Sequence, residues 1–474
     1  MAVPLTIKTT QQTSISTDLS AERLVNCFPR INGENAVAPL GLIGSHGYTE
    51  FGNAGAGSVV RGARATEDGT LGFVVTSNKL YTVSTSGTHT ERGTLSTSTG
   101  NVSIAVGEDY AMIVDGTAGY SYNINTTTFA TIADAQFLSN PTVCVHQDGY
   151  FITIGTSGGA YKLALSDLDD PTSWTTTNQT EAESTPDGLV SVISINRETF
   201  ALGATTCEIY INTGKSGFPF SRQTSREFGC AAAFTPVDVD GACYWLGRTR
   251  RCKAMLLRAF GGNIEVVPNE DMNRLFQSLT TVSDAFAYAY TDAGQTFYEI
   301  TFPTENQTWV YCINTNHFFK KQQNNGDRFV GSCYMFLNNK HIVGSRSNNK
   351  LFEMSLSVFT EDTGGSAIKR IITLPTIYDS YNWVGISNLI VNMDTSSFST
   401  PRTLTLETSE NGGDSFRTAQ TWSVQQNVDY AQFDGISAAK RLTLKLTFDA
   451  TNEFVLLNIM ADVFSYGNVM ESAQ

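Results

Sequence analysis

The sequence contains little charge and few of the residues that cover helix surfaces. Of its 474 residues only 16% are Asp, Glu, Lys or Arg, whereas 41% are hydrophobic. This apolar share supports a folded core and excludes wholesale disorder, which requires low hydrophobicity and high charge. Exposed helices are rich in Glu, Lys, Arg and Ala, so the low charge also argues against a mostly helical protein. Ser, Thr, Asn and 40 Gly take the place of the charged residues, as is typical of strands and turns.

Basic residues are in short supply. The 31 Lys and Arg are outnumbered by 45 Asp and Glu, which leaves a formal net charge of −14. A protein that binds nucleic acid by bulk charge needs a basic face. The composition therefore excludes that class of function.

Long apolar runs and paired cysteines are also missing. No window approaches the roughly 18–20 apolar residues that span a bilayer, and residues 1–20 have no signal-peptide pattern. We therefore expect no membrane-spanning segment. The cysteines form no CxxC pair, so we expect free buried thiols of a protein made in a reducing cytoplasm, and neither a zinc site nor a disulfide framework. They are Cys27, Cys144, Cys207, Cys230, Cys243, Cys252, Cys312 and Cys333.

A repeat is the most informative feature that is present. Units of β-branched runs, short turns and further strands start at about residues 58, 102, 142, 189, 235, 285 and 329. In the first unit, Val59-Val60 precedes an Asp68-Gly69 turn and the run Leu71–Val75. Four-stranded units of this length indicate a β-propeller. Seven units predict seven blades, or six blades and an entry hairpin. The alternative is a double-sheet β array whose spacing is accidental.

The remaining segments complete the expected organisation. Residues 363–474 contain alternating runs such as Leu442–Phe448, which predict a C-terminal β-sandwich of about a hundred residues. Residues 1–57 lack the repeat and are interpreted as an N-terminal arm and docking segment that becomes ordered on assembly. Residues 270–276 carry the best helix signal. The expected fold is all-β: a β-propeller of six or seven blades over 58–362, followed by the sandwich.

No catalytic constellation emerges from the sequence. Residues 409–416 have the spacing of a sialidase Asp-box, which is itself a hairpin turn, and the other residues of that chemistry cannot be assembled. Residues 155–159 lack the Lys of a phosphate loop, and the acidic run 167–171 lacks the pattern of a calcium loop. The five histidines have no metal-site spacing; they are His46, His89, His146, His317 and His341. We expect no enzyme, and we assign no catalytic, cofactor-binding or metal-binding residue.

One basic cluster stands out in this acidic chain. It comprises Arg248, Arg250, Arg251, Lys253 and Arg258. At a hairpin tip these side chains could meet phosphate or an acidic patch on a partner, or form a solvated turn or an inter-subunit salt bridge. Lys320-Lys321 is a weaker cluster of the same kind.

Three groups of short motifs resemble a known family. Ala182-Glu183-x-x-Pro186-Asp187-Gly188-Leu189 precedes Gly203-x-x-Thr206-x-Glu208-Ile209-Tyr210; Gly229-Cys230 precedes Cys243–Gly247; and Arg23–Pro29 precedes Gly41-Leu42 and Gly47-Tyr48. The order and character of these motifs resemble the packaged-DNA stabilisation proteins, or tail hub (nozzle) subunits, of short-tailed podovirus-type bacteriophages.

This resemblance implies a structural protein of the phage tail, located in the virion after synthesis in the host bacterial cytoplasm. Such a protein forms a ring, typically a homohexamer, below the portal and its adaptor, retains the packaged DNA and forms the channel for genome ejection. Tail needle, fibre or tailspike proteins are the expected distal partners. Two alternatives are a receptor- or glycan-binding propeller of the tail-fibre type and a glycosidase.

The acidic excess fits a channel through which DNA passes. Duplex DNA carries one negative charge per roughly 1.7 Å, so a basic channel wall would hold it. We expect carboxylates to concentrate on the wall and DNA to be a passing cargo, without sequence-specific binding.

Overall fold

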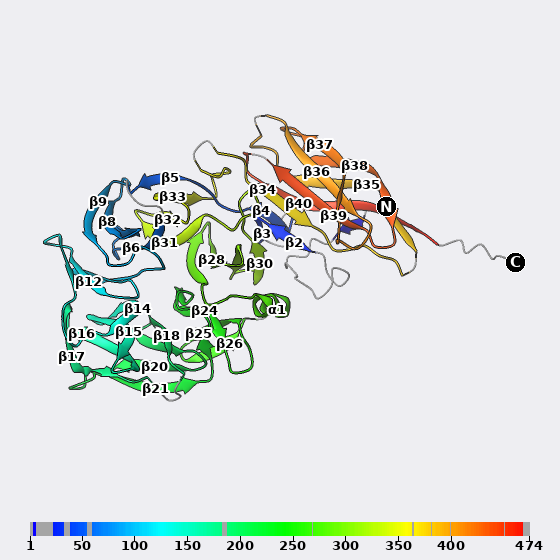
Figure 1. Ribbon diagram of the computed structural model, residues 1–474. Helices are drawn as coiled ribbons and strands as arrows, with labels where there is room; N and C mark the ends of the chain where they lie inside the picture. The colour runs from blue at the N-terminus through cyan, green and yellow to red at the C-terminus, as the bar shows by residue number, and fades with distance from the viewer. Residues whose placement is uncertain are drawn as a thin grey trace.

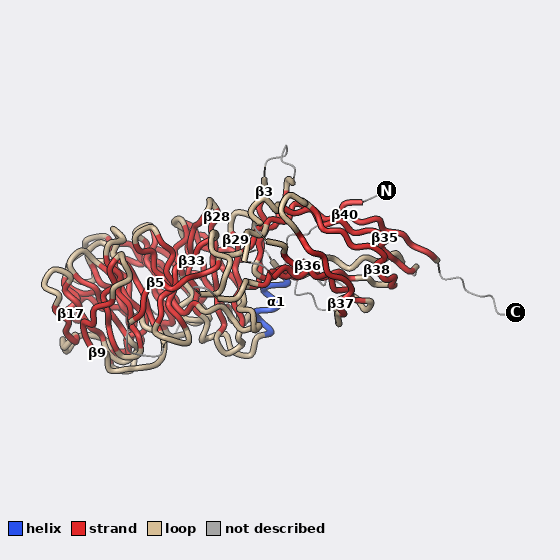
Figure 2. The backbone as a smooth tube through the Cα atoms, turned by 90° about the horizontal axis from the view of Figure 1, so that it is seen from above, coloured by secondary structure: helices blue, strands red, loops and turns tan. Residues whose placement is uncertain are grey.

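The computed structural model describes residues 3–5, 22–32, 38–54, 59–182, 187–267, 269–362, 365–380, 382–398, 400–449 and 451–467. Within these residues the fold is all-β apart from one helix, as the composition predicts. The chain forms a β-propeller with a β-sandwich at one side (Figure 1). Viewed from above, the propeller is a flattened disc and the sandwich extends away from its rim (Figure 2).

The first four blades of the propeller each use four consecutive antiparallel strands. Their strands are β6 (Val60–Ala65), β7 (Leu71–Thr76), β8 (Lys79–Ser84) and β9 (His89–Thr94); β10 (Ser103–Val106), β11 (Tyr110–Val114), β12 (Gly119–Asn123) and β13 (Thr128–Thr131); β14 (Ser139–Gln147), β15 (Tyr150–Ser157), β16 (Ala160–Asp167) and β17 (Asp170–Thr180); and β18 (Leu189–Ile195), β19 (Glu198–Gly203), β20 (Cys207–Asn212) and β21 (Phe220–Arg226).

Three further blades complete the disc. Their strands are β22 (Gly229–Cys230), β23 (Val237–Val239), β24 (Ala242–Arg248), β25 (Met255–Phe260) and β26 (Asn263–Val266); β27 (Phe286–Asp292), β28 (Gln295–Phe302), β29 (Gln307–Cys312) and β30 (His317–Lys320); and β31 (Gly331–Leu337), β32 (Lys340–Ser345), β33 (Lys350–Ser355) and β5 (Gly47–Asn53). The first strands contact one another in the cyclic order β6, β10, β14, β18, β23, β27, β31 and back to β6. The propeller therefore has seven blades.

An N-terminal strand closes this ring. In blade 7, β5 pairs antiparallel with β33, with Leu351 opposite Gly52 and Met354 opposite Tyr48. The two ends of the propeller thus share one sheet. The sequence division at residue 58 separates β5 from the blade to which it pairs, because no local pattern reveals a strand partner about 300 positions away.

The blades pack through side chains that alternate along each strand. In β7, Phe73 and Val75 belong to the hydrophobic core between blades 1 and 2, whereas Val74 belongs to the core between blades 7 and 1. Both faces of a central strand are buried in this way, so its sequence reads as a continuous apolar run. Separate cores of this kind lie between the successive blades from 2 to 6. The core between blades 6 and 7 is continuous with that of the sandwich.

The sandwich is built from both ends of the chain. One sheet runs β3 (Cys27–Ile31), β4 (Leu40–Gly44), β40 (Val455–Tyr466), β35 (Trp383–Met393) and β38 (Tyr430–Ala439), with β1 (Val3–Leu5) on β40. The other runs β2 (Arg23–Val25), β34 (Lys369–Thr373), β39 (Thr443–Asp449), β36 (Arg402–Ser409) and β37 (Arg417–Val424).

The second sheet of the sandwich continues into blade 6, where Val25 pairs with Lys320. Strands β2 to β5 therefore pair with strands of the sandwich and of blades 6 and 7 within the same chain. The ordering of residues 1–57 on assembly stays a prediction. The expected boundaries, after residues 57 and 362, fall next to segments outside the described residues.

The single helix follows blade 5. Helix α1 spans Glu270–Ser278, and Asn269 caps it by accepting a hydrogen bond from the N–H of Met272. Met272 and Phe276, one turn apart, are buried against blades 5 and 6. The helix predicted over 270–276 is confirmed.

Candidate functional site

A cavity of about 560 Å³ lies on the propeller axis and is lined by the first strand of each of the seven blades. This volume is the space that the centre of a water molecule can occupy; spread along inner strands of about 20 Å, and with the radius of water added on each side, it corresponds to a bore of roughly 9 Å. Duplex DNA is about 20 Å across. The axis of one propeller can hold water or a small ligand, but duplex DNA cannot pass through it.

Hydrogen bonds between neighbouring inner strands keep this bore narrow. The hydroxyl of Ser103 donates to Cys144 O in the next blade (3.2 Å), and Ser191 donates to Ala233 O (2.6 Å). At the closing seam, Ser332 of blade 7 donates to Val60 O of blade 1 (2.6 Å). Widening the bore would break these bonds, each of which contributes about 1 kcal/mol.

Asp187 organises the first family-like motif. Its carboxylate Oδ2 accepts the backbone N–H of Thr205 (2.6 Å) and of Thr206 (2.8 Å), together with both threonine hydroxyls. A Cβ at Gly203 would lie 2.5 Å from the Asp187 carboxylate, so glycine leaves the room that this contact requires. The motif is a rigid corner of blade 4. Glu183 and Pro186, which belong to the same motif, lie outside the described residues.

The second half of this motif forms a buried polar chain. Glu208 is almost fully buried on β20, accepts a hydrogen bond from the Tyr210 hydroxyl (2.6 Å) and forms an ion pair with Arg222 (3.3 Å). Burial, together with the hydrogen bond to Glu208, raises the pKa of Tyr210. The glutamate therefore ties two neighbouring strands of the blade together.

The Gly229 motif joins blades 4 and 5. The indole N–H of Trp245 donates to Gly229 O (3.0 Å), and Cys230 pairs with Gly247. A Cβ at Gly229 would lie 2.3 Å from the backbone nitrogen of Thr205. This glycine permits the close approach of the two blades.

Asn26, in the N-terminal motif, joins the propeller to the sandwich. It has φ of 54°, and its side-chain amide donates to Gln322 O and Lys369 O, both at 2.9 Å. Its side-chain oxygen accepts the N–H of Gln322 (3.0 Å). The described residues of all three groups of motifs thus hold the fold together.

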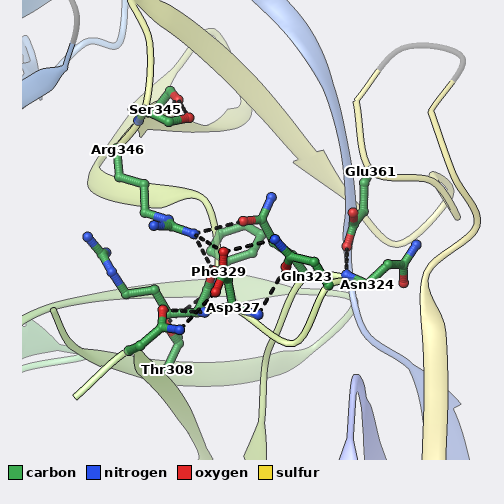
Figure 3. A network of polar contacts seen from close by, with 12 residues as sticks. Thr308, Gln323, Asn324, Asp327, Phe329, Ser345, Arg346 and Glu361 are labelled. Carbon is green, nitrogen blue, oxygen red and sulfur yellow. Dashed lines mark hydrogen bonds and ion pairs between the residues drawn. The ribbon is translucent and has the colours of Figure 1, made fainter. Parts of the chain in front are cut away.

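The connection between blades 6 and 7 is held by a second polar network (Figure 3). Arg346 donates to Gln323 Oε1 (3.0 Å) and pairs with Asp327 (3.5 Å). The Asn324 N–H donates to Glu361 (2.7 Å), beyond the last strand of blade 7. The connection is therefore anchored on both sides.

A buried ion pair beside this connection could not be recognised as such in the sequence. Lys321 Nζ lies 2.9 Å from Glu299 Oε2, and the two side chains are 2% and 0% exposed. The Tyr288 hydroxyl donates to Glu299 (2.6 Å), as does that of Tyr290 (3.2 Å). Lys321 also lies 3.7 Å from the centre of the Phe329 ring. The interpretation of Lys320-Lys321 as a surface cluster is therefore wrong for Lys321. The one sign of this ion pair in the sequence is Glu299, which lies among the apolar residues of β28.

The histidines are dispersed through the molecule. His46 Nε2 lies 3.0 Å from Asp292 Oδ2. Burial lowers the pKa of His46, and the hydrogen bond to His46 lowers the pKa of Asp292. The other histidines occur singly in blades 1, 3, 6 and 7. Within the described ranges, no three His, Cys, Asp or Glu side chains gather as metal ligands would.

The other sequence candidates occupy turns or buried positions. Ser409 Oγ accepts the N–H of Gly413 (2.9 Å) within the β36–β37 turn, so the Asp-box-like segment is a hairpin turn. Residues 155–157 end strand β15 and residues 158–159 form the β15–β16 turn, whereas residues 168–169 form the β16–β17 turn. The eight cysteines are free, and burial raises the pKa of Cys144 to about 12.

The basic cluster divides into two sets. Lys253 donates to the backbone oxygen of Thr280 (2.9 Å), and Arg258 pairs with Glu265 (3.3 Å), so both are used within the chain. Arg248, Arg250 and Arg251 are exposed at the β24–β25 turn. No helix among the described residues is long and apolar enough to cross a membrane.

The family model described as "Bacteriophage P22 Gp10, beta-propeller" matches residues 1–358. The chain belongs to this family. The P22 Gp10 family is one of phage structural proteins concerned with packaged-DNA stabilisation, so the resemblance seen in the motifs and the expected propeller are both confirmed. It is not a known enzyme family.

Comparison with solved structures adds only distant likenesses to this membership. A crystal structure of the computationally designed Ika8 protein is 10% identical, covers 65% of this chain and 100% of that chain, and has a TM-score of 0.36. A chain in the crystal structure of the Mitotic Checkpoint Complex is 10% identical in sequence and has a TM-score of 0.45; the match covers 64% of this chain and 90% of that chain. Neither likeness bears on function. A search of curated proteins finds no match.

Proposed function

We propose that this P22 Gp10 family member is a tail hub, or nozzle, that assembles as a closed ring of six copies below the portal and adaptor. The ring retains packaged DNA and later forms the channel for genome ejection. The width of the single propeller carries this proposal. A chain concerned with packaged DNA but with a bore of roughly 9 Å on its own axis can surround a duplex only by placing it between copies. A closed ring is the symmetric way to do so.

The proposed partners follow from this place in the virion. The upper face of the ring contacts the portal-adaptor protein, and the lower opening contacts a tail needle, fibre or tailspike protein. The subunit is made in the host cytoplasm, which agrees with eight free cysteines. Its role is structural and requires no cofactor.

DNA is the cargo of this ring. Each copy brings a formal net charge of −14, so a ring of six copies as a whole repels the phosphates of the duplex. Carboxylates on the wall keep the duplex from adhering during ejection. Retention then depends on a distal plug or on closure of the ring, and not on affinity for DNA.

Negative-stain microscopy of the purified full chain, alone and after mixing with a purified portal–adaptor complex, tests this proposal. The expected images show six-fold rings with a central hole, either free or attached to the adaptor. Discrete monomers in both samples, together with sugar binding in a glycan array, would instead favour a receptor-binding module.

A further inference from the structure

The exposed arginines belong to a loop of defined shape. This arginine loop, residues 248–254, joins β24 to β25 in blade 5. The Thr249 N–H donates to Cys252 O (3.0 Å), and Thr249 Oγ1 accepts the N–H groups of Arg251 (3.3 Å) and Cys252 (3.1 Å). Lys253 fastens the loop to the segment before β27 through Thr280 O. The turn therefore presents Arg250 and Arg251 outward without further ordering.

The three arginines of this loop pair with no carboxylate in the part of the chain that the structure describes. Among the described residues, no ion pair involves Arg248, Arg250 or Arg251, although acids exceed bases by 14 in the sequence. A hollow of about 410 Å³ lies beside the loop and is lined by Arg248, Lys253 and the hydroxyl residues Thr280, Thr281 and Ser283. Guanidinium and hydroxyl groups in this arrangement suit a carboxylate, which arginine binds in a bidentate fashion.

Carboxylates gather at the opposite end of other blades. The acidic turns, as we call them, are the β10–β11 turn of blade 2 and the β14–β15 and β16–β17 turns of blade 3. They carry Glu108, Asp109, Asp148, Asp167, Asp169 and Asp170. Arg197 pairs with Asp148 (3.0 Å), but the other five carboxylates form no ion pair with a described residue. Leu168, 59% exposed, adds an apolar contact at their centre.

The two patches suit a head-to-tail contact. The arginine loop follows the second strand of its blade, whereas the acidic turns follow first and third strands, so they lie at opposite ends of the blades. The two patches therefore lie on opposite faces of the propeller disc, on blades that are separated by blade 4. An interface that joins different surfaces of identical chains can close into a ring.

We propose that the arginine loop of one copy binds the acidic turns of the next copy, and that this contact builds the ring. The inference rests on the proposed ring. Like charges on matching surfaces prevent two acidic ends from associating, which fixes the polarity of assembly. Three arginines on one loop do not form the extended basic track that a duplex requires, so an acidic protein surface fits the loop better than DNA does.

A charge-swap experiment tests this contact. Variant A carries Arg250→Glu and Arg251→Glu, and variant B carries Glu108→Arg and Asp109→Arg; all four positions are exposed. Mass photometry is used to follow the full-length proteins, alone and mixed with the portal–adaptor complex. We expect at least a tenfold loss of ring formation in A and in B. Rings should return when A and B are mixed, because each reversed patch then meets a reversed partner.

A matched variant and the wild type separate the possible outcomes. Lys215→Glu with Lys440→Glu changes the charge as much as variant A does, at exposed positions outside both patches, and should assemble normally. Circular dichroism checks that each variant is folded. Rings formed by variant A, or no recovery in the mixture, overturn this contact while the ring itself stands. Absence of rings in the wild type under both conditions overturns the proposed function.

Discussion

Replacing Lys321 with Met tests how much the buried ion pair of blade 6 contributes to stability. The Lys321–Glu299 pair is 2.9 Å apart and almost without solvent, and Glu299 has no other cation within reach among the described residues. Removing the lysine leaves a carboxylate buried with only the hydroxyls of Tyr288 and Tyr290. Breaking a buried pair on one side costs about 3–5 kcal/mol. We therefore expect the free energy of unfolding of the Lys321→Met variant to fall by about that amount.

Two companion variants make this prediction sharp. Adding Glu299→Gln to Lys321→Met removes the unpaired charge but keeps an acceptor for the tyrosines, so at least half of the loss should be recovered. Lys320, at the neighbouring position, forms no ion pair with a described residue. The Lys320→Met variant should therefore change the free energy of unfolding by less than about 0.5 kcal/mol. Urea unfolding monitored by circular dichroism measures all three. The reasoning is refuted if Lys321→Met is as stable as the wild type, or if the double variant is as unstable as the single one.

Three more predictions concern other parts of the molecule. Asp187→Ala should cost about 2–3 kcal/mol because two buried N–H groups lose their acceptor, whereas Asp187→Asn should cost less than half as much; equal losses in thermal unfolding would contradict the assigned role. Burial lowers the pKa of His46 below that of the unfolded chain, so the unfolded state takes up its proton first and stability should fall as the pH decreases below about 6.5. The His46→Gln variant should show a weaker pH dependence. Wild-type unfolding curves that are the same at pH 7 and pH 5 would refute the predicted role of His46. Fluorescence anisotropy with a labelled duplex at 150 mM salt should give a Kd weaker than about 10⁻⁴ M, and micromolar binding would show that DNA is held as a ligand.

The repeat was readable from the sequence because a blade is a local unit. Turns such as Asp68-Gly69, and apolar runs such as Leu71–Val75, set the spacing of the strands and bury both faces of each sheet. Helix α1 was visible for the same reason, because its cap and buried residues lie within one short segment.

The closure of the ring and the make-up of the sandwich were not readable. β5 pairs with β33, and β4 pairs with β40, across most of the chain. Such pairings depend on which edges the remaining strands leave open, and no periodicity in one segment encodes them. In the sandwich, a register shift between Ile386 and Asn388 lets the runs Trp383–Ile386 and Leu389–Met393 continue as the single strand β35.

Charged residues were the hardest to place. Lys253, Arg250 and Arg251 stand together in the sequence, yet the first hydrogen-bonds to its own chain while the other two are exposed. Lys320 and Lys321 are neighbours with opposite surroundings. The surroundings of a charge are decided by partners that the fold brings from elsewhere: Glu299 for the buried Lys321 and Thr280 for the exposed Lys253.

Averaging of the tail in electron micrographs of intact virions is the most direct test of the central claim. The account predicts six copies of this chain in a ring below the adaptor, with DNA on the six-fold axis and between the propellers. Density for this chain at a fibre, or DNA running along the axis of a single propeller, would contradict it.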